Sequence, residues 1–274
     1  MSTRSAEASD VNPPAMASEQ TTRRALLGVS TLLFAASAAV TVGCCASMSG
    51  GMTMPGGWTM SMAWMRMPGQ SWSGAAASFL AMWTVMMVAM MLPSLVPMLW
   101  RYRQAAARSG ASRLGGPTAL VGVGYFVVWT ALGGLAFPLG VALAALEMQR
   151  PAAARAVPIA VGLVVVLAGS LQLSRWKARH LACCREAPGR TLPADARTAW
   201  RHGLRLGLHC ALCCAGPTAI LLVAGVMDLR AMAGVTAAIT LERLAPAGER
   251  VARAMGVACV GAGVLLVVRA AGVG

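Results

Sequence analysis

The sequence predicts an all-α fold, a polytopic transmembrane helix bundle of about seven spans with the N-terminus inside and the C-terminus outside. Hydrophobic residues make up 57% of the 274 residues and charged residues only 12%, against roughly 25% charged residues in soluble domains. The apolar residues gather in stretches of about twenty, the length that crosses a hydrocarbon core of about 30 Å. The seven stretches are 25–46, 74–100, 117–146, 156–174, 204–227, 229–245 and 254–272.

The basic residues predict the orientation. The net charge of +14 rests on 23 Lys and Arg, and these residues lie between the apolar stretches. With the N-terminus inside, 18 of them fall on the inner side and 5 on the outer side, as the positive-inside rule requires. We therefore expect the lipid bilayer, and no nucleic acid, as the surrounding partner.

The chain divides into a tail and a membrane domain. Residues 1–24 are rich in Ser, Ala, Thr and Pro, which predicts a disordered cytoplasmic tail. Residues 25–274 form the helical membrane domain, with a basic inner loop at 175–203 and a Met-rich outer loop at 47–73. Exposed thioethers on a mobile outer loop could collect Cu(I), whereas the alternative is an interfacial loop anchored by tryptophans. The residues concerned are Met48, Met52, Met54, Met60, Met62, Met65 and Met67, and Trp58, Trp64 and Trp72.

The fifth span opens with a cluster of metal-ligating side chains in the segment GLHCALCCAGPTAILL. His209, Cys210, Cys213 and Cys214 lie within a turn and a half, and the three cysteines share one helix face. Pro217 removes the amide that would bond the carbonyl of Cys213, which predicts a kink at the thiols. Thiolate and imidazole suit Cu(I) and also Zn(II). The alternative is that these cysteines pack as small apolar residues.

The second span adds thioethers, because it carries Met82, Met86 and Met90 in one row and Met87 and Met91 in another. Thiolate combined with thioether favours Cu(I), although methionine at this spacing also serves as core filler. At 1.5 Å per residue, Met90, Cys213 and Glu242 reach similar depths and could converge in the inner half of the membrane.

Two further groups are candidate ligands. In the inner loop, His180 precedes Cys183 and Cys184 by three and four residues, a smaller version of the His209 cluster. Glu242 lies near the end of the sixth span, and an ionisable residue at membrane depth is a functional candidate. The alternative for Glu242 is an interfacial charge paired with Arg243.

The chain resembles a bacterial family described as predicted metal-binding integral membrane proteins, some members of which are labelled copper chaperones. The match runs from about residue 74 to 270. It rests on AMMLPSLVP, on LQLSRWK followed by CCRE, on LHCALCC, and on GVMDLRAM leading to LERLAP. The sequence departs from the family at 212–215, where LCCA replaces a Gly-Cys-Cys-Trp run. The resemblance implies metal binding and a multi-pass location in the bacterial cytoplasmic membrane.

These observations favour a non-enzymatic membrane protein that binds copper. We expect Cu(I) to be received at the outer Met loop and delivered to a periplasmic or membrane cuproenzyme. Two alternatives stay open. One is a transporter or permease subunit for a metal or small solute, with the Pro-containing second and fifth spans lining the path. The other is a thiol-disulfide oxidoreductase that uses the Cys210 and Cys213 pair. The expected ligands are Met90, Met91, Cys210, Cys213 and Cys214.

Overall fold

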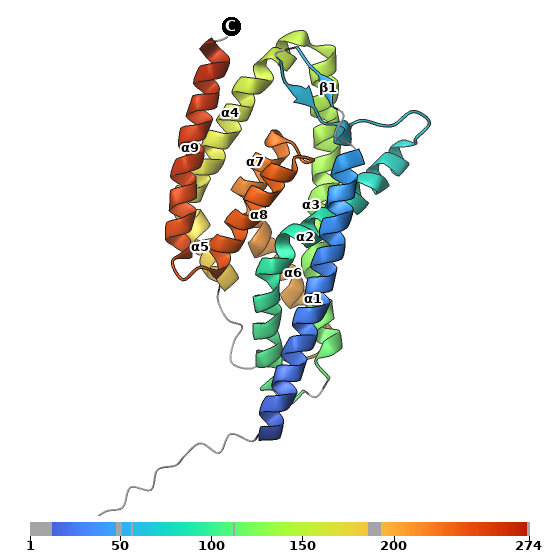
Figure 1. Cartoon of the computed structure of the whole chain (residues 1–274), viewed down its shortest axis with the longest axis vertical. Helices are drawn as coiled ribbons and strands as arrows, with labels where there is room; N and C mark the ends of the chain where they lie inside the picture. The colour runs from blue at the N-terminus through green and yellow to red at the C-terminus, as the bar shows by residue number, and fades with distance from the viewer. Residues whose placement is uncertain (1–12, 48–50, 56, 112, 186–192, 273–274) are drawn as a thin grey trace, which may run out of the picture.

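The protein is α-helical almost throughout, as the sequence predicts (Figure 1). A computed structural model describes residues 13–47, 51–55, 57–111, 113–185 and 193–272. In order, these residues form α1 (Pro13–Ser47), β1 (Met52–Thr53), β2 (Thr59–Met60), the 3-10 helix η1 (Met62–Trp64), α2 (Trp72–Ala107), α3 (Gly115–Gln149), α4 (Pro151–Leu173), α5 (Arg175–Arg185), α6 (Ala196–Cys213), α7 (Ala215–Ala224), α8 (Leu229–Leu244) and α9 (Gly248–Gly272).

Among the described residues, five helices are long and apolar enough to cross a membrane, namely α1, α2, α3, α4 and α9. The bent pair of α6 and α7 makes a sixth span if it is counted as one. Helix α8 covers the predicted span 229–245 but has only 16 residues. It is therefore about 24 Å long, short of a core of about 30 Å. The predicted count of seven spans is not confirmed.

The long helices alternate in direction. The start of α1 and the C-terminal end of α9 consequently lie at opposite ends of the molecule (Figure 1). The β1–β2 hairpin and the C-terminal end of α9 lie at the same end of the molecule (Figure 1). The placement of the two termini on opposite sides of a membrane, and the assignment of the inner side, stay predictions from the arginines.

Two segments that were expected to lack regular structure are helical in part. Helix α1 begins at Pro13, so residues 13–24 are helical, and proline is well tolerated in a first turn. The part of α1 that is long and apolar enough to span a membrane begins at Glu19. Residues 1–12 lie outside the described residues. In the basic inner loop, α5 forms because Lys177, Leu181 and Cys184 bury one face at helical spacing. Residues 186–192 of that loop also lie outside the described residues.

The Met-rich outer loop is partly folded. Strands β1 and β2 pair antiparallel, and Met54 and Met60 are buried in a small core at the corner between α3 and α4. Trp58 anchors this corner, because its Nε1 donates to the carbonyl of Ala154 at 2.9 Å. The expectation of exposed thioethers is wrong for Met54 and Met60, since apolar burial outweighs the freedom of the loop. Met48 lies outside the described residues.

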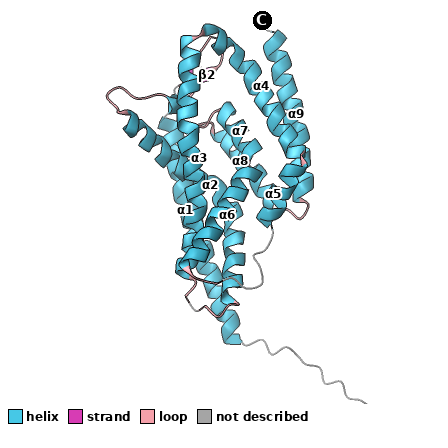
Figure 2. Ribbon diagram, turned by 180° about the vertical axis from the view of Figure 1, so that it is seen from behind, coloured by secondary structure: helices cyan, strands magenta, loops and turns pink. Residues whose placement is uncertain are grey.

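Glycines bring two pairs of helices into backbone contact. Figures 1 and 2 show α4 and α9 side by side. A Cβ on Gly169 of α4 would lie 2.8 Å from the carbonyl oxygen of Gly256 of α9, and one on Gly162 would lie 3.1 Å from that of Gly263. Helices α3 and α6 also approach each other closely, at Gly207 of α6, where an added Cβ would meet the backbone of α3. Small residues allow this close approach, which membrane helices use in place of a hydrophobic driving force.

We expect Gly169→Leu to force α4 and α9 apart. Overpacking of this kind costs about 1–3 kcal/mol, so the variant should unfold at a lower temperature than the wild type in detergent. The matched control is Gly261→Leu on α9, where an added Cβ meets nothing within 4 Å. Equal unfolding temperatures for the two variants would contradict the proposed packing.

Candidate metal centre

The helix breaks at the cysteines. Helix α6 ends at Cys213, α7 begins at Ala215, and the two axes are bent by 62°. The predicted kink is confirmed. Pro217 has no amide hydrogen, so the carbonyl of Cys213 lacks its helical partner. Lys177 of α5 takes that place, because its Nζ donates to the Cys213 carbonyl oxygen at 2.7 Å.

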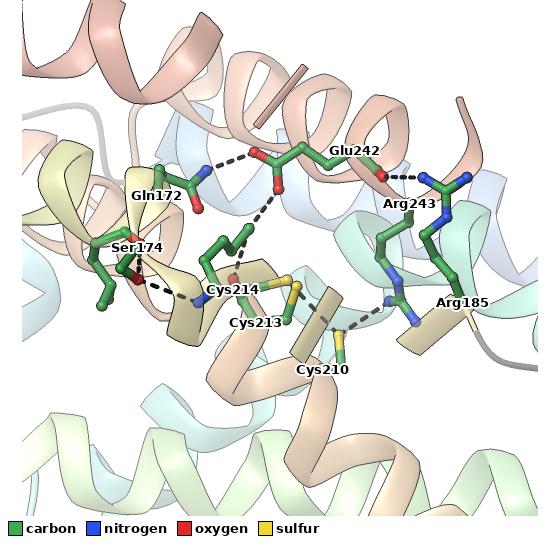
Figure 3. Close-up of polar contacts among 10 residues, drawn as sticks. Gln172, Ser174, Arg185, Cys210, Cys213, Cys214, Glu242 and Arg243 are labelled. Carbon is green, nitrogen blue, oxygen red and sulfur yellow. Dashed lines mark hydrogen bonds and ion pairs between the residues drawn. The ribbon is translucent and has the colours of Figure 1, made fainter. Parts of the chain in front are cut away.

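A buried ion pair holds α5 and α8 against this break. Lys177 is 1% exposed, and its Nζ lies 2.6 Å from Oε2 of Glu242. The other carboxylate oxygen of Glu242 accepts from Nε2 of Gln172 on α4 (Figure 3). Both oxygens of Glu242 are therefore engaged within the protein. This candidate ligand lies next to the cysteines, and it serves there as the counter-charge of Lys177 instead of pairing with Arg243.

Arg243 brings a second buried cation to the site. It is 2% exposed, and its Nη1 contacts Sγ of Cys210 at 3.1 Å (Figure 3). The same Nη1 donates to Oγ of Ser94 at 2.9 Å and contacts Oη of Tyr125 at 3.5 Å. Its Nε and Nη2 have no partner, and no carboxylate of the described residues forms an ion pair with it. A buried charge without a counter-charge is strongly unfavourable. The site therefore carries one uncompensated positive charge beside a thiol.

Four buried cysteines, Cys184, Cys210, Cys213 and Cys214, belong to one buried cluster around the break. Sγ of Cys210 lies 3.8 Å from Sγ of Cys214. Since a metal–sulfur bond is about 2.3 Å for zinc, one metal ion fits between Cys210 and Cys214. In the described part of the chain, no three His, Cys, Asp or Glu side chains are grouped so that they could hold one metal ion. The thioethers of α2 in the same buried cluster are candidates for a third ligand.

The predicted methionine ligands lie in the same buried core as the thiols. Met90 and Met91 belong to the cluster that contains Cys210 and Cys214. Ser94 follows Met90 by one helical turn on α2, and its Oγ accepts from Arg243. Met90 and Met91 therefore lie about one turn of α2 from a residue that contacts Arg243.

The histidines are held apart from this core. Nδ1 of His209 lies 3.4 Å from Nδ1 of His180, and Trp176 packs edge-on against His180 with ring centroids 4.5 Å apart. Both histidines are half-buried, and Cys183 is exposed. The two predicted His clusters therefore meet as one His pair between α5 and α6, and of the α5 cysteines only Cys184 reaches the buried thiols.

Sequence reasoning missed three residues of the site. The sequence analysis treated Lys177 only as one of the basic residues of the inner loop and Arg243 only as a possible partner of Glu242. It did not identify Tyr125. A signal was available for the cations, because Lys177 lies in LQLSRWK and Arg243 in LERLAP, two motifs of the family resemblance.

The fold and the site together define a membrane protein of several spans with a buried, sulfur-rich centre. Its long helices expose large apolar side chains such as Leu32, Leu135 and Leu167, which is typical of contact with lipid.

The model of the PpoB2 family, described as a copper chaperone, matches residues 80–266. Since this is more than half of the chain, the protein belongs to the PpoB2 copper chaperone family, as the sequence resemblance indicated. Searches of curated proteins and of solved structures found no match.

Proposed function

We propose that this protein binds Cu(I) between the thiolates of Cys210 and Cys214, in the bacterial cytoplasmic membrane, and delivers the ion to a cuproenzyme. The observation that carries this proposal is the pair of sulfurs 3.8 Å apart beside the unpaired guanidinium of Arg243. Soft sulfur ligands select Cu(I), and the family membership supports copper as the cargo.

The charges of the site favour Cu(I) over zinc. Lys177 and Glu242 cancel each other, which leaves the single positive charge of Arg243. Cu(I) with two thiolates carries a net charge of −1 and would neutralise that charge. Zn(II) with the same two thiolates is neutral and would leave Arg243 uncompensated in a buried position.

The remaining ligands suggest how the ion is held and released. A thioether of Met90 or Met91 would complete the site. Cys213 and Cys184 lie in the same buried cluster as Cys210 and Cys214, and the His180 and His209 pair lies between α5 and α6. Exchange along these side chains would carry Cu(I) from the core to the surface of the protein at α5.

The contacts argue against the thiol-disulfide alternative. That alternative requires Cys210 and Cys213 to act as a pair, but the thiol in contact with the Cys210 sulfur is that of Cys214, at 3.8 Å. All eight cysteines are free. The transporter alternative keeps one supporting observation, the 62° break between α6 and α7, and metal flux into proteoliposomes would identify it.

The proposal predicts that Cys210→Ser/Cys214→Ser binds one copper ion fewer per chain than the wild type. Serine keeps the size of the side chain but replaces a soft sulfur by a hard oxygen. Full-length protein in detergent would be loaded anaerobically with Cu(I) and its copper measured by elemental mass spectrometry. The control is Cys259→Ser, which alters a half-buried cysteine of α9 outside the thiol group. Equal copper in all three proteins would refute the site.

A further inference from the structure

A second pair of sulfur ligands lies outside the site described above. Sγ of Cys45, in the last turn of α1, lies 3.8 Å from Sδ of Met227. The two residues are 182 positions apart in the sequence. Cys45 is 4% exposed and Met227 is half-buried. The contact therefore forms only because the end of α1 packs against the connection between α7 and α8.

The connection that carries Met227 is an ordered turn. Gly225 begins it with φ of 121°, a backbone conformation that glycine adopts without strain. Asp228 ends it, because its backbone amide donates to the Gly225 carbonyl and its Oδ1 accepts from the amides of Arg230 and Ala231 at the start of α8. The thioether is thus held in place opposite the thiol.

The α2 thioethers connect this pair to the proposed copper site. Cys45 belongs to the same buried cluster as Met86, Met90 and Cys210, and Met227 packs against that cluster. Met82, Met86 and Met90 follow one another along α2 at steps of about 6 Å. The row ends at Ser94, which contacts Arg243 beside Cys210. The sulfurs of this pair, of the α2 row and of the buried thiols therefore all lie in or against one buried cluster.

We propose that Cys45 and Met227 form a second Cu(I) site that receives the ion and passes it along the α2 methionines to Cys210 and Cys214. This inference rests on the proposed function of those two cysteines. A thiolate with a thioether is a soft ligand pair suited to Cu(I). Cys45 lies two residues before the end of α1, and the Met-rich segment, the expected collecting loop, follows directly in the chain.

The transfer is a sequence of ligand exchanges without oxidation or reduction. The copper stays Cu(I) throughout. At each step one metal–sulfur bond forms while another breaks. The Cys45 thiol loses its proton to solvent when copper binds and regains one when copper leaves, and the balancing deprotonation takes place at the receiving cysteine.

The test measures Cu(I) bound per chain in four full-length proteins loaded anaerobically in detergent. The proteins are the wild type, Cys45→Ser, Cys210→Ser/Cys214→Ser, and the triple variant. We expect Cys45→Ser and the double variant each to bind one ion fewer than the wild type, and the triple variant to lose both. X-ray absorption of copper in the double variant should show sulfur ligands. Met227→Leu, which conserves volume, should weaken Cu(I) binding at least tenfold in the double-variant background, whereas the exposed Met148→Leu should not.

The outcomes separate the two proposals. If Cys45→Ser binds as much copper as the wild type while the double variant loses an ion, the receiving site is refuted and Cys210 and Cys214 stand. If the double variant equals the wild type, the proposed function itself fails. Unfolding temperatures of all variants check that the losses do not reflect misfolding.

Discussion

Lys177→Met is expected to lower the free energy of unfolding by about 3–5 kcal/mol, the usual effect of removing one partner of a buried ion pair. The substitution leaves the buried Glu242 carboxylate without its cation and the Cys213 carbonyl without its donor. Thermal or denaturant unfolding of the full-length protein in detergent would measure the loss.

Two controls test the cause of that loss. Lys177→Met/Glu242→Leu removes both charges and should recover a large part of the stability, because a buried pair is often replaceable by apolar residues. Arg253→Met breaks the exposed pair with Glu249, at 3.9 Å, and should change stability by less than about 1 kcal/mol. A single Lys177→Met variant as stable as the wild type would contradict the assigned role of this lysine.

Arg243→Met is expected to weaken Cu(I) binding about 10- to 100-fold, the usual range for a residue that supports metal ligands without binding the metal. The guanidinium contacts the Cys210 sulfur at 3.1 Å and supplies the positive charge that the bis-thiolate complex neutralises. Affinity would be measured by competition with a chromophoric Cu(I) chelator, with the exposed Arg250→Met as the control.

The same variant should separate binding from stability. In the copper-free protein Arg243 is a buried cation without a carboxylate partner, so its removal should leave the unfolding temperature unchanged or raise it. Binding of Zn(II), for which the charge of Arg243 is of no use, should not fall. Equal losses of Cu(I) and Zn(II) affinity would show that Arg243 acts only by holding α8 in position.

These two cations have different roles although they are neighbours in the structure. Lys177 is fully paired and joins α5 and α8 to the break in α6. Among the described residues, two nitrogens of Arg243 have no partner, which is the arrangement expected where an anionic complex is to be bound. Stability and metal affinity are therefore expected to depend on different residues of one site.

Local features of the sequence were sufficient for the fold class and for the break at the thiols. Long apolar stretches predict membrane helices because the bilayer requires about twenty apolar residues per span. Pro217 predicts the kink because a missing amide acts on the carbonyl four residues earlier. Both effects operate within a few turns of one helix and need no knowledge of its neighbours. The bounds of α8 were predicted to within one residue, because the stretch 229–245 is flanked by Asp228 and Pro246.

Only the tertiary structure decided which side chains meet. The pairing of Lys177 with Glu242 over 65 residues, the approach of Arg243 to Cys210 over 33 residues, and the contact of Cys45 with Met227 over 182 residues all depend on how the helices cross. Those crossings follow from glycine contacts and side-chain packing between distant segments, and helical periodicity does not encode them. The sequence thus specified which ligands were available, and helix packing determined which of them came together.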